Sequence, residues 1–169
     1  MKHFFIVAVV CLAAGFISCG GPGEKKFADA GAYDSVITAR VDQMQQTLFA
    51  VQKVTGADDS ATADLGRFVN QIDSVAKSLK ELPAYKGNTG YRDAAVRLAD
   101  FYKKSVSGSY AEIGRIYKEV KDSTLADNKV NELIIKLQEE ETLADDAFIK
   151  EREAFAAKNN IKLEEDPAK

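Results

Sequence analysis

Histidine is almost missing from this chain of 169 residues. The only one, His3, lies directly ahead of an apolar run typical of a signal peptide, so the exported protein would contain none. Histidine is the usual general base, proton shuttle and transition-metal ligand near neutral pH. Its loss excludes Ser-His-Asp and Cys-His catalysis, bundle di-iron sites built on Glu-x-x-His pairs, and histidine-ligated haem. We therefore expect a protein that is not an enzyme and has no cofactor or metal.

Positive charge is also in short supply. The chain has 23 Lys and Arg against 26 Asp and Glu, and removing residues 1–18 takes away Lys2 and no acidic residue, so the mature charge would be −4. Nucleic-acid binding asks for a basic face. Apart from Gly20-Gly21-Pro22-Gly23, the glycines stand apart, and neither common phosphate-binding loop is present. We expect no nucleic-acid partner.

The N-terminus reads as an export signal. The chain is uncharged from Phe4 to Gly23, and its most apolar part, Phe4 to Ala14, has the length of a signal-peptide core. A transmembrane helix needs about 20 predominantly apolar residues, and here glycine, serine and proline interrupt the run from Gly15 onward. The segment therefore predicts a signal peptide rather than a transmembrane anchor.

The stretch Phe16-Ile17-Ser18-Cys19-Gly20 resembles a lipobox, although Phe16 stands where Leu is usual. The resemblance implies that Cys19 accepts a diacylglycerol and becomes the first residue of the mature protein. The alternative is that Cys19 is an ordinary cysteine near a cleavage site. Because Cys11 lies inside the signal, no intramolecular disulfide is expected. Two or more acyl chains anchor a protein stably. In enterobacterial lipoproteins an Asp directly after the lipidated cysteine signals retention in the inner membrane. Gly20 stands at that position here, which favours the outer membrane.

The rest of the chain has the periodicity of amphipathic helices, with apolar residues at steps of three and four. Four segments are expected, running from about Asp29 to Gly56, Ser60 to Pro83, Tyr91 to Val120 and Leu125 to Asn159. The inward positions include Tyr33, Ile37, Val41, Met44, Leu48 and Val51 in the first segment, Leu65, Phe68, Ile72, Val75 and Leu79 in the second, Ala95, Leu98, Tyr102, Val106, Ile113 and Ile116 in the third, and Val130, Leu137, Ala144, Phe148 and Phe155 in the fourth.

Two local features indicate where these helices bend or end. Gly108, between two serines, indicates a bend or a close helix contact, because a helical glycine costs about 1 kcal/mol relative to alanine. Asn159-Asn160 predicts the end of the last helix, since Asn accepts a left-handed turn.

These segments predict an all-α fold, an up-down-up-down four-helix bundle behind a cleaved lipoprotein signal peptide. The expected organisation is a signal peptide over 1–18, a lipidated tether over 19–27, a bundle over 28–163 and a frayed tail over 164–169.

The connector Leu82-Pro83-Ala84-Tyr85-Lys86-Gly87-Asn88, followed by Tyr91-Arg92-Asp93-Ala94-Ala95 and Phe101-Tyr102, resembles small helical surface lipoproteins of leptospires and Bacteroidetes. The closing stretch from Phe155 to Leu163 is similar too. The resemblance implies a cell-envelope lipoprotein with an all-helical domain of uncharacterised role, and it brings no catalytic residue.

Two candidate binding sites follow from the pattern. Tyr85, Lys86 and Asn88 lie on the longest connector, and loops carry function more often than helix faces do. They form either a recognition patch for a protein or glycan partner, or a bundle end that Tyr85 plugs while Gly87 and Gly90 supply the turn. Glu141 falls on the inward line of the last helix, where it is paired with Arg or Lys, marks a polar cavity, or reaches water from a boundary position.

Three further groups of residues have both a functional and a purely structural interpretation. Phe101, Tyr102, Tyr110 and Tyr117 would line a ligand pocket or pack in the core. The acidic runs 139–141 and 145–146 would offer oxygens to Ca²⁺. However, consecutive residues on a helix point about 100° apart, so their carboxylates do not converge on one ion. Basic residues of the third segment, read as solvated surface, are Arg92, Lys103, Lys104, Arg115, Lys118 and Lys121.

Two functions are compatible with these features. The first is a membrane-anchored, non-enzymatic lipoprotein that contacts membrane lipid through Cys19 and acts in interaction or scaffolding. The second is a module that binds a small molecule or glycan between its helices. An enclosed cavity with converging polar groups would favour the second, and an exposed apolar patch would favour the first.

Overall fold

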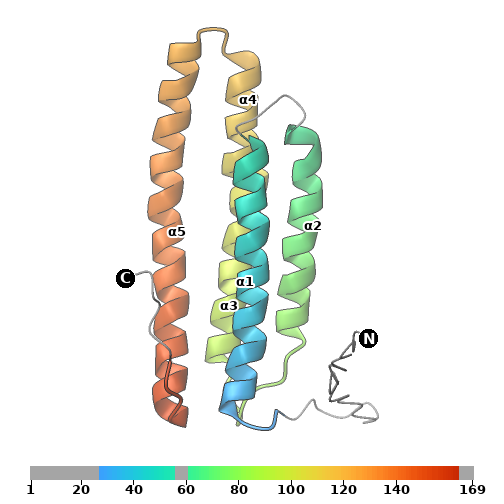
Figure 1. Cartoon of the computed structure of the whole chain (residues 1–169), viewed down its shortest axis with the longest axis vertical. Helices are drawn as coiled ribbons and strands as arrows, with labels where there is room; N and C mark the ends of the chain where they lie inside the picture. Colours follow the sequence, from blue (N-terminus) through green and yellow to red (C-terminus); the bar gives the residue numbers. More distant parts are fainter. Residues whose placement is uncertain (1–26, 56–60, 164–169) are drawn as a thin grey trace, which may run out of the picture.

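The computed structural model describes residues 27–55 and 61–163, with the side chains of residues 61–64 left aside (Figure 1). The expected signal peptide, Cys19, nearly all of the tether and the tail 164–169 lie outside the described residues. So do Gly56 and Ser60, the expected end of the first helical segment and start of the second.

Every regular element of the described residues is helical. The elements are α1 (Ala30–Thr55), α2 (Ala61–Lys80), α3 (Gly90–Ser105), the π-helical segment η1 (Val106–Tyr110), α4 (Ala111–Glu119) and α5 (Ser123–Asn159). Because η1 joins α3 to α4 without a break, the ribbon forms four long columns (Figure 1). No strand occurs over 27–55 or 61–163, where the only bridge is an isolated one between Tyr85 and Asn88. The all-α prediction is confirmed.

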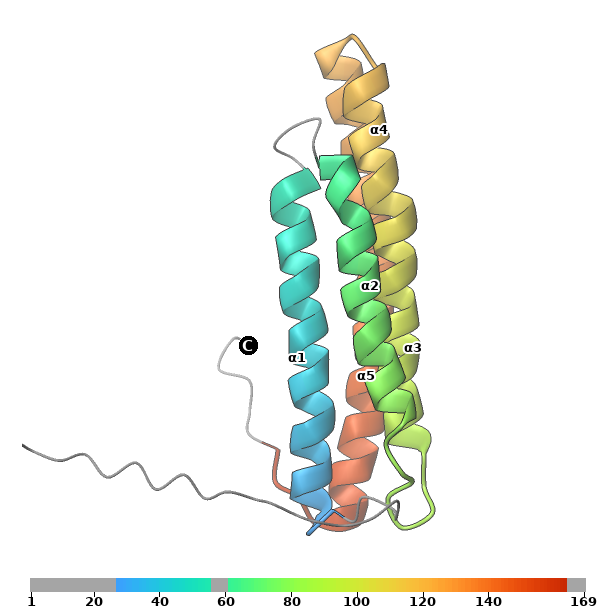
Figure 2. The ribbon, with the colours of Figure 1, turned by 90° about the vertical axis from the view of Figure 1, so that its right-hand side faces the viewer.

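The four columns lie side by side along the long axis, and their two ends differ. At one end, which we call the base, lie the start of α1, the connector 81–89 and the end of α5 (Figure 1). At the other end, which we call the tip, the turn 120–122 joins α4 to α5. Figure 2 shows that α4 and α5 extend past the ends of α1 and α2. The tip is therefore a two-helix hairpin that the other columns do not cover.

The predicted apolar stripes form one core. The largest fully buried side chains are Tyr33, Tyr102, Ile37, Met44, Ile72, Leu79, Leu98, Val51 and Val106. The chief packing partners are α1 with α2, α2 with α3, and α3 with α5, whereas α1 and α5 touch little. Ala144, expected to point inward, is only half-buried. The last column thus rests on α3 rather than closing tightly on α1.

The third column departs from the expectation at Gly108. A Cβ added there would meet nothing within 4 Å, so the alternative of a close helix contact is wrong. The chain instead widens into the π turn η1, and the Ser107 hydroxyl donates a hydrogen bond to the Lys103 carbonyl at 2.9 Å. Single π turns are inserted into α-helices without ending them, so this column continues into α4.

The end of α5 is confirmed at Asn160. This residue has φ 56° in the left-handed region, and its N–H donates to the carbonyls of Ala156 and Ala157. The next N–H, of Ile161, donates to Ala156 at 3.0 Å, and the Ile161 side chain packs against the core. These bonds satisfy carbonyls that a helix end leaves free.

Candidate functional site

The connector at the base is built around a two-residue turn. Tyr85 and Asn88 exchange two backbone hydrogen bonds of 3.0 Å each, and the central residues, Lys86 and Gly87, have φ of 49° and 78°. Positive φ at both central positions is the geometry of a type I′ turn. Glycine adopts it freely, but a residue with a Cβ loses roughly 1–2 kcal/mol there. Lys86 is therefore held in an unfavourable conformation that its surroundings impose.

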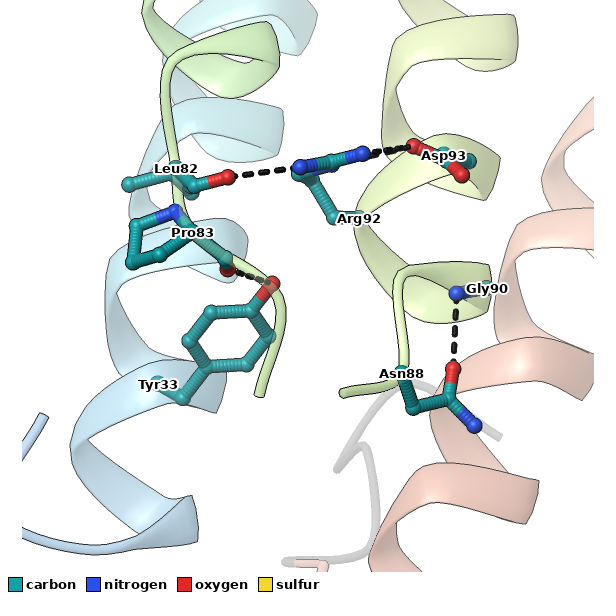
Figure 3. A network of polar contacts seen from close by, with 7 residues as sticks. All are labelled: Tyr33, Leu82, Pro83, Asn88, Gly90, Arg92 and Asp93. Atoms are coloured by element: carbon teal, nitrogen blue, oxygen red, sulfur yellow. Dashed lines mark hydrogen bonds and ion pairs between the residues drawn. The ribbon is translucent and has the colours of Figure 1, made fainter. Parts of the chain in front are cut away.

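Side chains from two other elements fix this connector (Figure 3). The Arg92 guanidinium donates to the Leu82 carbonyl at 2.7 Å and to the Asp93 carboxylate. The Tyr33 hydroxyl, from α1, donates to the Pro83 carbonyl at 3.1 Å. Asn88 accepts from the N–H of Gly90 at 2.8 Å. These bonds tie both ends of the connector to α1 and α3.

The predicted loop residues were expected either to form a recognition patch or to close the end of the helices, and each role is taken by some of them. Tyr85 is half-buried, with ring centroids 5.3 Å from Tyr33 and 5.4 Å from Phe155, so it plugs the end of the bundle. Lys86 and Asn88 are exposed. The Lys86 ammonium lies over the Tyr85 ring, 5.4 Å from its centroid.

All three predicted loop residues line one cavity, which we call the base cavity. Its volume is about 160 Å³ and its other walls come from the last turns of α5 and the first of α3. The full lining is Tyr85, Lys86, Asn88, Tyr91, Glu151, Ala154, Phe155, Lys158 and Asn159. The sequence did not indicate the α5 half of this cavity, because nothing in helical periodicity says which loop faces which turn.

A buried ionic cluster beside the base cavity was also missed. The Asp34 carboxylate, 10% exposed, accepts two bonds of 2.9 Å from the Arg152 guanidinium and one of 2.7 Å from the Tyr91 hydroxyl. Burial, together with the bond to Asp34, raises the pKa of Tyr91, and the Asp34 bonds raise the pKa of Arg152. The available signal was Arg152 itself, four residues after Phe148 and three before Phe155 on the inward line. The cluster ties α1, α3 and α5 together.

Glu141 lies half-buried on α5 and forms no hydrogen bond or ion pair within the described residues. It is therefore not paired with Arg or Lys there. Burial, and next the charge of Asp145, raise its pKa. Asp145 accepts from the Tyr102 hydroxyl at 2.8 Å, and burial raises its pKa too. The result is a pair of partly desolvated carboxylates one turn apart.

The remaining groups have structural roles. Tyr102 and Tyr110 are in the core, Tyr110 accepting from Gln52 at 3.1 Å, while Tyr117 is 47% exposed, so the third-column rings do not converge on a pocket. Among the basic residues, Lys103 pairs with Asp73, and Arg115 with Glu112 and Glu119.

Within 27–55 and 61–163, no three His, Cys, Asp or Glu side chains are arranged to hold a metal ion. The same ranges contain no helix with both the length and the apolar character needed to cross a membrane.

A second hollow, which we call the tip groove, runs between α4 and α5. It has a volume of about 460 Å³ and an apolar floor of Ile116, Val120 and Leu133. Its rim carries six charges of alternating sign, from Glu112, Arg115, Glu119, Lys129, Glu132 and Lys136. Near it, Tyr117 and Leu125 are about half exposed, at 47% and 48%.

Comparisons with protein families, with curated proteins and with solved structures find no match for this chain.

Proposed function

We propose that this protein is a lipid-anchored, non-enzymatic lipoprotein of the cell envelope, tethered to the outer membrane through Cys19, whose up-down-up-down four-helix bundle acts in protein interaction or scaffolding. The lipobox-like sequence supports the anchor. The absence of histidine after residue 3 supports a role without acid–base catalysis.

The observation that carries the interaction role is the uncovered hairpin at the tip. Its groove combines an apolar floor with a charged rim that sums to zero, and Tyr117 and Leu125 expose apolar surface beside it. Interfaces with other proteins have an apolar centre and a polar rim. Such a surface suits a protein partner better than a charged polymer.

The tether length supports a partner-facing tip. Eight peptide units separate Cys19 from Phe27, and an extended chain covers at most about 3.3–3.6 Å per residue. The base would then stay within roughly 30 Å of the lipid surface. The 37 residues of α5 rise by about 55 Å. A lipidated Cys19 would thus leave the tip as the part with the longest reach.

The anchor is tested by Cys19→Ala in a bacterial host that processes lipoproteins. The wild-type chain should partition into detergent, and the mass of its first peptide should include the acyl chains. The variant should lose both properties. A variant that is cleaved normally and stays on the membrane would overturn the proposal.

The interaction role is tested by photo-crosslinking in the envelope from Leu125 at the tip and, as the matched control, from exposed Ala157 near the base. A discrete adduct is expected from the tip only, and Leu125→Glu should suppress it when the probe is moved to Lys129. Equal adducts from both positions would contradict a dedicated tip surface.

A second function, binding of a very small molecule or of the end group of a larger one, is favoured by the base cavity. Lys86 is held there in an unfavourable backbone conformation, and such outliers gather at functional sites.

A further inference from the structure

Three charged side chains line the base cavity. Lys86, Lys158 and Glu151 all line it, and none forms an ion pair within the described residues. At the tip groove Arg115 is paired with Glu112 and Glu119, whereas Lys129 and Glu132 form no ion pair within the described residues. Two lysines and one glutamate among the residues that line one small cavity form a pattern that a ligand of complementary charge would satisfy.

The charge pattern calls for a ligand with both signs. The two ammonium groups favour an anion, and lysine binds phosphate as a compact point charge. The Glu151 carboxylate disfavours a purely anionic ligand, yet it would accept bonds from an ammonium. A phosphate joined by a short linker to an ammonium meets both requirements.

The size of the cavity limits what enters it. Pockets for drug-sized ligands have about 300–1,000 Å³, whereas this one has about 160 Å³. It suits the end group of a larger molecule or a very small solute. Ala154 and Phe155 supply the apolar wall that a two-carbon linker would touch.

A sugar fits these walls less well. Sugars pack their C–H faces on open aromatic rings, but Tyr91 and Phe155 are only 3% and 8% exposed. The ring of Tyr85 is flanked by Tyr33 and Phe155 and approached by the Lys86 ammonium. The rings therefore serve as walls and leave no broad stacking surface.

We propose that the base cavity binds a phosphoethanolamine group, with the phosphate between Lys86 and Lys158 and the ammonium at Glu151, and that its source is the headgroup of a membrane phospholipid. The choice of a lipid over a free phosphomonoester rests on the proposed function, because a lipidated Cys19 would bring the base to the bilayer. Binding would hold the domain upright, with the tip pointing away.

The ligand chemistry is tested on the full-length chain carrying Cys19→Ser, in a phosphate-free nonionic detergent. The probes are O-phosphoethanolamine, inorganic phosphate, ethanolamine and glucose. A ligand of the native state raises the melting temperature, by roughly 2–4 °C at about five times its dissociation constant for a chain of this size. O-phosphoethanolamine should give this shift, phosphate a smaller one, and ethanolamine and glucose none.

Three variants identify the site. Lys86→Asn keeps a residue that tolerates positive φ while removing the charge, so loss of the shift would not reflect a broken turn. Lys158→Gln should lose the shift as well, and Glu151→Gln should make phosphate and phosphoethanolamine equivalent. Lys80→Gln, an exposed lysine outside the cavity, should behave as wild type. Absence of a phosphoethanolamine shift, a larger glucose shift, or a shift that survives Lys158→Gln would each overturn the ligand assignment.

The source is tested with lipidated wild-type protein in vesicles of phosphatidylcholine with or without phosphatidylethanolamine. Hydrogen exchange at residues 85–90 should slow at least three-fold only when phosphatidylethanolamine is present, and not in Lys158→Gln. An equal rate in both vesicles would overturn the lipid source. Because the melting experiment needs no lipidation, its outcome is separate from that of the Cys19→Ala test.

Discussion

At the scale of single residues, Asp34 is the most buried carboxylate among the ion pairs of the described residues. Two hydrogen bonds from Arg152 and one from Tyr91 reach the Asp34 carboxylate, so its charge is matched although it is buried. A well-packed apolar set could be as stable as such a pair, but removing one partner leaves an uncompensated charge. The cluster therefore specifies how α5 sits against α1 and α3 more than it adds net stability.

We expect Arg152→Met to lower the free energy of unfolding by about 3 kcal/mol, near the lower end of the range for broken buried pairs. The lower end applies because the Arg152 side chain is 33% exposed. Urea unfolding of the full chain measures the loss. Adding Asp34→Asn should recover part of it, since no buried charge then remains.

The matched control is Arg115→Met, which removes an equally bidentate guanidinium from the surface. Exposed ion pairs contribute little, so this variant should unfold close to wild type. If the two variants were indistinguishable, the Asp34 cluster would have no special role.

Glu141 should make the protein more stable in mild acid. Burial, and then the neighbouring Asp145, raise its pKa in the folded state. The folded chain therefore binds more protons than the unfolded chain, and the free energy of unfolding increases as the pH falls from neutral toward the ordinary glutamate pKa of 4.5. We expect Glu141→Gln to raise the melting temperature at pH 7, and this advantage to vanish near pH 4.5.

Exposed Glu139→Gln is the control for Glu141, because it removes the same charge from the same helix. Exposed substitutions usually change stability by no more than about 0.5 kcal/mol. An advantage of Glu141→Gln that did not depend on pH, or that Glu139→Gln shared, would point to net charge instead of desolvation.

At the scale of elements, Gly108 and Gly87 show two different uses of glycine. Gly108 lies in η1 with open space where a Cβ would be, whereas Gly87 has φ 78°. Gly108→Ala should stabilise the chain by about 0.5–1 kcal/mol, since alanine has less freedom to lose in a helix. Gly87→Ala should destabilise it by about 1–2 kcal/mol. Thermal unfolding of the pair measures both, and a loss in Gly108→Ala would mean that the wide turn requires glycine.

The elements also show what periodicity can and cannot predict. The stripes from Tyr33 to Val51 and from Leu98 to Ile116 are buried as expected, because steps of three and four place residues on one face. The π turn was not predicted, because serine and glycine mark a weak helix without saying how it deforms. The end of α5 at Asn160 was predicted because one residue type favours one backbone conformation.

The base cavity was predicted only in part, because one of its two halves comes from a distant helix. Tyr85, Lys86 and Asn88 are visible as members of a loop rich in turn formers. Glu151 and Lys158 complete the cavity from α5, more than 60 residues away in the sequence. Which turn of α5 meets the loop depends on how the columns pack lengthwise. Helical periodicity determines the buried face but not this offset.

At the scale of the whole molecule, the two ends have different chemistry. The base holds a small cavity whose charged side chains form no ion pair within the described residues, and the tip holds a larger groove whose charges sum to zero. If Cys19 carries lipid, these ends face opposite directions, and α5, about 55 Å long, sets the distance between them. The orientation on the membrane then decides whether the tip is available to a partner.

We expect an upright orientation, which fluorescent probes on single cysteines can measure. In the lipidated protein Cys19 is blocked and Cys11 removed, so Ala84→Cys at the base and Leu125→Cys at the tip each provide one reactive thiol. Both positions are exposed. In vesicles that contain phosphatidylethanolamine and a headgroup quencher, the base probe should be strongly quenched and the tip probe unaffected. Adding Lys158→Gln should weaken quenching at the base, because the headgroup then loses one of its ammonium partners. Equal quenching at the two ends would mean that the bundle lies flat on the bilayer, with the tip groove no better presented to a partner than the base.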